Sequence, residues 1–299
     1  MAEVTIGVPV YNGADLLDQS LACLARQTFG DFKVLIFDNA STDATPDIAK
    51  AWAARDARFH YTLQPRNVGA VANFRDVLLA ADTPWFLWRA DDDLSDDNYV
   101  EVLYRLATHS PGCELAISSV VNCDVDGSRE RLWRPPTIVD PSSTRGRLRL
   151  SLNCHPAAFY GLWRREAIIR AFLPVSQRFP FAFASDHLTF YGPIIAGAVR
   201  ATDQTRLIAR TRRAPGPRTR VRTPFATMVE VRQAFRHELR RIRAERQPAP
   251  ALRVALTLSE PIYLKRTLPS LLKMARTGLR ELLGIAGPRV VKRHFERNV

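Results

Sequence analysis

Trp85-Phe-Leu-Trp-Arg-Ala-Asp91-Asp92-Asp93-Leu94 is the stretch from which the fold can be worked out. Large apolar residues dominate its start, and three consecutive carboxylates, here called the acidic triplet, come near its end. A short apolar run closed by a turn signal is typical of a core strand, although its periodicity also allows a buried helix segment. We predict a buried strand over Trp85 to Trp88, with the acidic triplet exposed at its carboxyl end.

Adjacent carboxylates repel one another, so the acidic triplet needs positive charge beside it in a folded protein. Mg²⁺ and Mn²⁺ prefer hard oxygen ligands, and bound Mg²⁺ usually takes one or two carboxylates together with substrate phosphates. The pattern therefore indicates a divalent metal site. The alternative is a solvated acidic turn, in which Asp93 or Ser95 caps a helix that begins near Asp96.

Strand-like and helix-like segments alternate before this stretch. Buried strands are expected over residues 4–10, 32–38 and 59–63, and helices over residues 14–27, 45–55 and 71–81. This alternation is typical of βαβ units on a parallel sheet. We predict an α/β fold in which helices flank a mostly parallel central sheet, with a basic helical extension at the C-terminus.

Polar residues follow three of the predicted strands. Tyr11 and Asn12 follow the first, Asp38 and Asn39 end the second, and the acidic triplet follows the fourth. Ligands of such sheets bind beyond the carboxyl ends of the strands, so the three groups predict a nucleotide site at one edge. Taken singly, Asp38 has the simpler alternative of capping a turn, and Tyr11 that of packing.

The charge of the chain is unevenly distributed. The net charge is +13, yet residues 206–299 hold 23 Lys and Arg against 6 Asp and Glu, so the rest of the chain is slightly acidic. Such asymmetry indicates an anionic partner surface. We therefore divide the chain into a first domain of residues 1–213 and a basic region of residues 214–299.

The cysteines and apolar runs give an expectation for the cellular compartment. The four cysteines show no zinc or redox spacing, which favours reduced thiols in a cytoplasmic protein. No signal-peptide pattern precedes the first strand. No apolar run approaches the roughly 18 residues of a membrane-spanning helix.

The basic region contains two helical patterns. Met228 to Arg246 predicts a helix with one apolar stripe, and a second amphipathic helix begins near Leu264, with leucines opposite lysines and arginines. Such a helix lies readily in an anionic membrane interface, at about 1 kcal/mol per nearby cation. We expect residues 262–297 to contact the inner face of the cell membrane. The equally open alternative is a helix packed on the first domain with a solvated basic side.

Several motifs are similar to those of family 2 glycosyltransferases, in the branch that includes many bacterial rhamnosyltransferases and other polysaccharide-assembly enzymes. They are Val4-Thr-Ile-Gly-Val-Pro-Val-Tyr-Asn-Gly13, Leu24-Ala-Arg-Gln-Thr-Phe29, Phe37-Asp-Asn-Ala-Ser-Thr-Asp43 and Asn67-Val-Gly-Ala-Val-Ala-Asn-Phe74, followed by the acidic triplet. The resemblance implies a GT-A fold, a nucleoside diphosphate sugar donor and a divalent metal, Mg²⁺ or Mn²⁺. It also implies inverting transfer to a glycan or polyprenyl-linked acceptor in surface polysaccharide assembly.

The same resemblance assigns roles at the nucleotide site. It implies a nucleobase pocket lined by Pro9, Val10 and Tyr11, with Asp38 hydrogen-bonded to the base. Asn67 belongs to the same site. Asp91 would lie near the ribose, and Asp92 with Asp93 would face the metal and the diphosphate. Many relatives carry Asp-x-Asp-Asp, and because Ala90 stands at the first Asp of that pattern, the ligand assignment is open by one residue.

For the acceptor side, the resemblance places the catalytic base at Asp186, which would take a proton from the acceptor hydroxyl. The alternative is that Asp186 caps the helix that follows it. His187 could share this role or orient Asp186. Trp163, in a segment that resembles the acceptor side of the family, is a candidate platform for sugar stacking, and a core position is the alternative.

Many relatives have a histidine after the sheet that approaches the metal or the diphosphate, and this chain has arginines in the comparable region. Arginine donates to phosphate in a bidentate manner, so we predict that Arg210 or Arg213 neutralises the leaving diphosphate. Two other functions compete with glycosyl transfer. A nucleotidyltransferase would need a Gly- and Lys-rich phosphate loop that is not seen after the first strand, and a nucleic-acid-binding protein would act through the basic region. No nucleic acid is expected.

Overall fold

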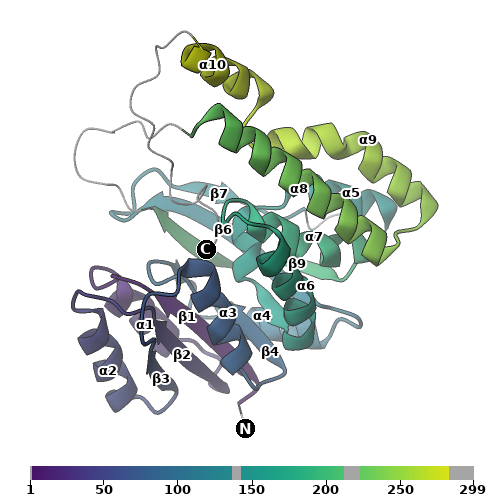
Figure 1. The fold of residues 1–299 in the computed structure, drawn as a ribbon. Helices are drawn as coiled ribbons and strands as arrows, with labels where there is room; N and C mark the ends of the chain where they lie inside the picture. The colour runs from purple at the N-terminus through teal and green to yellow at the C-terminus, as the bar shows by residue number, and fades with distance from the viewer. Residues whose placement is uncertain (1, 137–142, 212–222, 283–299) are drawn as a thin grey trace.

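The computed structural model describes residues 2–136, 143–211 and 223–282 (Figure 1). Within these residues the centre is a nine-stranded sheet with the order β3-β2-β1-β4-β8-β6-β9-β5, and β7 pairs with β6. The strands are β1 (Val4–Val10), β2 (Phe32–Asp38), β3 (Phe59–Leu63), β4 (Trp85–Trp88), β5 (Leu94–Ser95), β6 (Leu115–Asp124), β7 (Arg131–Trp133), β8 (Leu162–Arg164) and β9 (Val199–Thr211).

The N-terminal half of the sheet is parallel. β1 pairs in parallel with β2 and β4, and β2 pairs in parallel with β3. Three helices connect these strands: α1 (Leu17–Ala25), α2 (Thr45–Arg55) and α3 (Ala70–Ala80). The predicted strands and the α/β fold class are therefore confirmed, and the carboxyl ends of β1, β2 and β4 meet at one edge.

The other half of the sheet is mixed. β8 runs antiparallel to β4 and β6, whereas β9 runs parallel to β6 and antiparallel to β5. The helices of this half are α4 (Tyr99–Thr108), α5 (Thr144–Asn153), α6 (Arg165–Arg178) and α7 (Ser185–Ala196), and a 3₁₀ turn covers Pro156–Tyr160. β9 was not predicted, because its charged sequence shows no apolar run. Its backbone pairing with β6 and β5 makes it a strand, since strand formation depends strongly on tertiary context.

β4 shows why the opening stretch is continuously apolar. Trp85 and Leu87 point into one hydrophobic core, and Phe86 and Trp88 point into the core on the other side of the sheet. Successive side chains of a strand alternate between the two faces, so a strand covered on both faces must be apolar at every position.

Three helices form the C-terminal part of the described chain: α8 (Phe225–Arg246), α9 (Pro250–Thr267) and α10 (Leu271–Leu282). They lie at the end of the molecule opposite the N-terminus (Figure 1). The predicted apolar stripe of α8 is buried, as shown by its residues Met228, Val231, Phe235, Leu239 and Ile242. α8 packs on α7 in a third hydrophobic core, and Arg178 of α6 pairs with the buried Glu238 at 2.7 Å.

The predicted helix that begins near Leu264 differs from the structure. α9 begins earlier, at Pro250, and the chain breaks at Leu268–Ser270 before α10. Leu264 and Leu268, predicted to belong to the membrane-facing stripe, are buried in the third core because α9 packs on α5 and α8. Residues 283–297 of the predicted membrane segment lie outside the described residues. In the described ranges, no helix is both long and apolar enough to cross a bilayer.

Candidate active site

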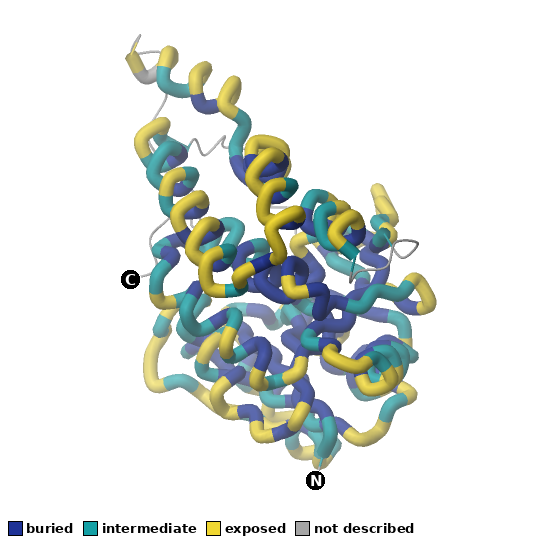
Figure 2. The backbone as a smooth tube through the Cα atoms, turned by 90° about the vertical axis from the view of Figure 1, so that its right-hand side faces the viewer, coloured by how far each residue is buried: buried dark blue, intermediate teal, exposed yellow. Residues whose placement is uncertain are grey.

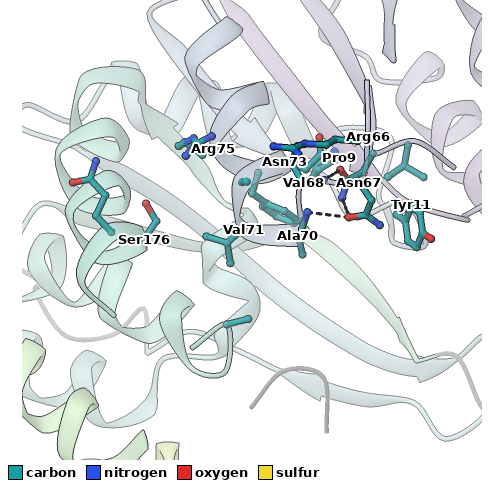
Figure 3. A pocket seen from close by; sticks show the side chains of 17 residues that line it. Pro9, Tyr11, Arg66, Asn67, Val68, Ala70, Val71, Asn73, Arg75 and Ser176 are labelled. Atoms are coloured by element: carbon teal, nitrogen blue, oxygen red, sulfur yellow. Dashed lines mark hydrogen bonds between the residues drawn. The ribbon is translucent and has the colours of Figure 1, made fainter. Parts of the chain in front are cut away.

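A pocket of about 1060 Å³ lies at the carboxyl end of β1 (Figure 3). Pro9, Val10 and Tyr11 line it together with Asn67, while Ser176 near the end of α6 lies on the facing side. The structure thus brings together four of the residues predicted for the nucleotide site. The identity of the occupant stays a prediction.

Asn67 is held by a small hydrogen-bond network. Its side-chain oxygen accepts from the amide of Asn39 at 3.0 Å and from the N–H of Gly69 at 2.9 Å. The Asn39 oxygen in turn accepts from the N–H of Val68 at 2.8 Å. These bonds fix the turn before α3, where Gly69 adopts a φ of 86° that favours glycine. Asn67 therefore has a structural role in shaping the pocket wall.

Asp38 requires a correction. The predicted hydrogen bond to a nucleobase needs an accessible carboxylate, but Asp38 is fully buried. One of its oxygens accepts from the N–H of Ser41 at 2.9 Å, and the other accepts from the hydroxyl of Tyr61 at 2.9 Å. Asp38 therefore holds the loop after β2, which agrees with the simpler alternative of a turn cap.

The loop after β1 connects the pocket to the acidic triplet. Asn12 adopts a left-handed φ of 51°, and its side-chain oxygen accepts from the N–H of Thr42 at 2.8 Å. At Gly13 a Cβ atom would overlap with the carboxylate of Asp91. The absence of a side chain at Gly13 therefore lets this loop approach the carboxylate of Asp91 closely.

β9 supplies an arginine to the acidic triplet. Asp93 is 5% exposed, and its carboxylate accepts from the backbone N–H of Arg210 at 2.9 Å. The Arg210 side chain donates to the carbonyl oxygen of Asp92 and, at 2.6 Å, to the side-chain oxygen of Gln19. Burial and the nearby charge of Asp92 raise the pKa of Asp93 to about 7. Arg210 thus lies at the triplet, while Arg213, the other predicted arginine, lies outside the described residues.

A second arginine near the triplet had not been singled out in the sequence. Arg89 follows β4 and has no exposed surface. Its guanidinium donates to the Ser95 hydroxyl at 2.9 Å and lies 5.3 Å from the ring centre of Tyr99. Its positive charge opposes the rise in the pKa of Asp93. Its position in the sequence could have indicated that it is buried. Arg89 directly follows a four-residue apolar strand, so its charged side chain has to be accommodated in the core.

The acidic triplet fits a shared metal site better than an all-protein one. Within the described part of the chain, no group of three or more His, Cys, Asp or Glu is arranged to hold a metal ion. Mg²⁺ needs only one or two carboxylates when substrate phosphates complete its shell. A cation would also relieve the repulsion between Asp92 and Asp93 that raises the pKa of Asp93. Of the two predicted ligands, Asp92 is partly exposed, whereas Asp93 is buried and its carboxylate accepts from the N–H of Arg210, so the prediction of an exposed triplet is wrong for Asp93.

Asp186 lies in the first turn of α7, after the left-handed Ala184 with a φ of 63°. It is the second residue of the helix and not the N-cap, and its carboxylate accepts from the N–H of His187 at 2.7 Å. Burial raises the pKa of Asp186 to about 6. A carboxylate with a raised pKa accepts a proton more readily near neutral pH, which suits the predicted base.

Tyr160 connects Asp186 to the acidic triplet electrostatically and had not been predicted as a site residue. Burial, together with the charges of Asp93, Asp186, Asp92 and Asp91, raises the pKa of Tyr160. Its backbone carbonyl accepts from the hydroxyl of Tyr99 at 3.0 Å, which ties the 3₁₀ turn to α4. The negative charges of Asp186 and of the acidic triplet therefore both contribute to the raised pKa of this one buried tyrosine.

The two predicted acceptor residues have different outcomes. His187 lines a second cavity together with Asp186, and burial lowers its pKa to about 4, so the imidazole is neutral at neutral pH. Trp163, in contrast, is fully buried, and its indole N–H donates to the carbonyl of Phe159 at 3.0 Å. A buried ring offers no face to a sugar, so the platform prediction for Trp163 is wrong and the alternative of a core position holds.

Comparison with known proteins identifies the class. Residues 5–172, more than half of the chain, match the family described as Glycosyl transferase family 2. The chain belongs to this family. Neither a nucleotidyltransferase nor a non-enzymatic nucleic-acid-binding protein is needed to explain its sequence.

Individual relatives match parts of the chain. The PGL/p-HBAD biosynthesis glycosyltransferase of Mycobacterium bovis is 32% identical over 160 residues, which are 52% of this chain and 58% of that protein. Glycosyltransferase GlyA of Streptococcus pneumoniae is 29% identical over 103 residues, which are 34% of this chain and 15% of that protein. The matches span less than two thirds of the length of these curated relatives.

Among solved structures, S. aureus TarS 1-349 in complex with UDP superposes with a TM-score of 0.59 at 16% sequence identity. The superposition covers 80% of this chain and 65% of that one. The complex of the same TarS fragment with UDP-GlcNAc gives a TM-score of 0.58 at 14% identity, over 90% of this chain and 82% of that one. At these identities the likeness shows the fold alone.

Proposed function

We propose that this glycosyltransferase moves a sugar with inversion from a nucleoside diphosphate sugar to a hydroxyl group of a glycan or lipid-linked glycan acceptor, with a divalent metal as cofactor. The observation that carries the proposal is the arrangement of its carboxylates. The acidic triplet follows β4 and meets the loop after β1 at Gly13, whereas Asp186 lies in the first turn of α7, so the two sets of carboxylates belong to different elements. One group can serve the acceptor and the other the donor.

On the acceptor side, Asp186 takes the proton of the attacking hydroxyl. With a pKa of about 6 the carboxyl is mostly ionised at pH 7, and it is basic enough to accept a proton as the new bond to the anomeric carbon forms. Its hydrogen bond from the N–H of His187 fixes the orientation of the carboxylate. In an inverting transfer the hydroxyl attacks opposite to the departing diphosphate, so the base and the triplet must lie on opposite sides of the sugar.

On the donor side, positive charge stabilises the departing diphosphate. A divalent metal held by Asp92 and Asp93 would neutralise the negative charge that develops on the leaving phosphate. The chain itself contributes Arg210, which is anchored to Gln19 and to the backbone of Asp92. Arg89 holds the underlying segment through Ser95. These arginines keep the triplet in place before the donor binds, which is the preorganisation that electrostatic catalysis requires.

We further propose a role in cell-envelope polysaccharide assembly, with peripheral binding of the protein to the cytoplasmic face of the membrane. Apolar residues on the outer surface of α9 and α10 support this proposal. Val254, Leu258 and Ile262 recur at every fourth position of α9, and α10 adds the exposed residues Leu271, Leu272, Leu279 and Leu282. Arginines and lysines accompany these residues, and apolar side chains with flanking cations favour an anionic interface.

A ligand-binding screen tests the proposed function. The protein is melted with UDP, GDP or dTDP in the presence of Mn²⁺ or Mg²⁺, because a ligand that binds only the folded state raises the melting temperature. We expect one nucleotide to raise it strongly, and only together with the metal. Alanine at both Asp92 and Asp93 should abolish the part of the rise in melting temperature that depends on the metal. A metal-dependent shift that persists in the folded double variant would contradict the proposed site.

A further inference from the structure

A second cavity lies beside Asp186 and is closed by the C-terminal part of the chain. Its volume is about 370 Å³, within the range of about 300–1,000 Å³ that is usual for ligand pockets. Asp186 and His187 of α7 form one wall, and Tyr263 and Thr267 of α9 form another. The cavity therefore joins the candidate base on α7 to α9, and both helices follow the residues 5–172 that match the family.

α9 is fixed in this position by several contacts. Arg266 donates to the carbonyl of Leu152 and to the side chain of Asn153, both at 2.7 Å, which ties α9 to the end of α5. Arg243 of α8 donates to the buried Glu260 at 2.8 Å. Tyr263 itself packs in the third hydrophobic core. The wall formed by α9 is therefore a built part of the fold.

Two buried polar atoms on residues that line this cavity have no hydrogen-bond partner in the described chain. They are the hydroxyl oxygen of Tyr263, a residue that is 3% exposed, and Nδ1 of His187. A buried polar group without a partner costs about 1–3 kcal/mol, so native proteins rarely leave one without a reason. The neighbouring Tyr191 does not share this property, because its hydroxyl accepts from Arg243 at 2.7 Å.

The protonation states of both groups suit recognition of a neutral hydroxyl compound. Burial, with Tyr191, Cys154 and Asp186 nearby, raises the pKa of Tyr263, so its hydroxyl keeps its proton and can donate. Burial lowers the pKa of His187 to about 4, so the imidazole is neutral and offers one donor and one acceptor. Phe183 and Pro156 are among the apolar residues of the lining, and Arg266, which also lines the cavity, donates to Leu152 and Asn153. Apolar walls with a few convergent polar groups are the usual composition of a small-molecule site.

We propose that this cavity is the acceptor subsite, that it binds an uncharged sugar residue, and that Tyr263 of α9 positions that residue for attack by hydrogen-bonding one of its hydroxyls. The inference rests on the proposed function, because it takes Asp186 as the base that receives the proton. It assigns α9 a part in acceptor specificity.

Binding of simple sugars tests this inference without knowledge of the natural acceptor. A panel of methyl glycosides of common hexoses and deoxyhexoses is offered to the full chain, and binding is followed by saturation-transfer NMR. We expect at least one glycoside to bind the wild type. Tyr263→Phe, which removes only the hydroxyl, should weaken that binding by about 3- to 10-fold, as expected for one neutral hydrogen bond. Tyr104→Phe is the matched control, because its hydroxyl contacts Glu3 far from this cavity.

Stability distinguishes a ligand contact from a structural role. Because the Tyr263 hydroxyl has no protein partner, Tyr263→Phe should leave the melting temperature unchanged or raise it. Thr267→Trp, which places a large side chain at the cavity, should abolish glycoside binding while the metal-dependent shift with nucleotide stays. Point variants are used because removal of α9 would expose the third core.

The outcomes separate this inference from the proposed function. Glycoside binding should survive in Asp92→Ala, which disables the donor side only. If no glycoside binds the wild type, or if both Tyr263→Phe and Thr267→Trp bind glycoside as well as the wild type, the acceptor subsite is wrong even when nucleotide binding is intact. If binding follows the expected pattern but no sugar is transferred from any nucleotide sugar, the proposed function is wrong while the cavity remains a sugar site.

Discussion

At the scale of single residues, the raised pKa of Asp186 links activity to stability. The pKa is about 6 in the folded protein, against about 3.9 in an unfolded chain. Between these two values the folded state binds more protons, so the contribution of Asp186 to stability falls as the pH rises from about 4 to about 6. Above pH 6 the charged carboxylate destabilises the fold in full, and this is the form that the proposed mechanism needs.

Asp186→Asn should therefore slow sugar transfer and stabilise the protein. Loss of a general base typically costs about 10²- to 10⁴-fold in rate, while the asparagine oxygen can still accept from the N–H of His187. We expect a higher melting temperature at pH 7 and a smaller difference from the wild type at pH 4.5. In the wild type the transfer rate should fall below about pH 6. A variant that transfers sugar at the wild-type rate would remove Asp186 from the mechanism.

The sequence predicted which residues lie near the site better than it predicted which atoms those residues contact. Tyr11 was expected at the pocket because it follows a strand end, which is readable in the sequence, and Asn67 because its motif resembles one of the family. Asp38 follows the same rule, but Tyr61 and Ser41 use both of its oxygens. Trp163 is equally ambiguous in sequence, since burial is decided by the elements that pack around it. Such partners come from distant parts of the chain, and one sequence does not reveal them.

At the scale of elements, β9 sets the geometry of the donor side. It runs between β6 and β5, so its pairing places Arg210 directly against the acidic triplet. The strands β1 to β4 were predictable because their apolar runs are local signals. β9 was not, because its partner residues on β6 lie 84 to 87 positions earlier in the sequence and its own side chains are largely polar. The same holds for α9, whose buried face is visible only in the packed structure.

Arg210→Lys tests this role of β9. Lysine keeps the positive charge but cannot reproduce the two directed side-chain bonds to Gln19 and the backbone of Asp92. We expect a loss of about 1–3 kcal/mol in unfolding free energy and weaker metal-dependent nucleotide binding. Chemical denaturation and titration with the nucleotide found in the screen measure the two effects.

Arg206→Lys provides the matched control on the same strand. Arg206 pairs with Asp96 at 2.9 Å at the surface, and exposed pairs contribute at most about 1 kcal/mol. It should therefore change stability little and nucleotide binding not at all. If Arg210→Lys and Arg206→Lys change the unfolding free energy and nucleotide binding by the same amounts, Arg210 does not organise the triplet.

At the scale of the whole molecule, the positive charge of the C-terminal region has carboxylate partners within the fold. Part of it is used internally, because Arg236, Arg240 and Arg243 of α8 surround the buried Glu260 of α9. Arg246 likewise approaches Glu114 of the sheet domain at 3.6 Å. α8 therefore packs on the first domain, and the alternative of a packed helix, stated for the segment that begins near Leu264, holds for the inner face of α9. The outer faces of α9 and α10 remain exposed at the end of the molecule (Figure 2).

These exposed faces lead to a prediction about membrane binding. Leu258 is 76% exposed on α9 and Leu279 is 57% exposed on α10, so both can enter a lipid interface without disturbing the third core. We expect the full chain to float with vesicles that contain anionic lipid, and to float less with neutral vesicles or at high salt, since screening weakens surface attraction. The double variant Leu258→Glu with Leu279→Glu should lose most of this binding, because each change removes apolar insertion and adds repulsion from the anionic surface.

The control for the double variant is a matched change elsewhere. Leu79 on α3 is 49% exposed on another part of the molecule, so Leu79→Glu alters surface charge without touching α9 or α10. It should float like the wild type. The metal-dependent shift with nucleotide should be the same in all three proteins, because Leu79 lies near the C-terminal end of α3, whereas the pocket is lined by the first residues of that helix. Equal flotation of the double variant and Leu79→Glu would show that α9 and α10 do not bind the membrane, and it would leave the transferase mechanism untouched.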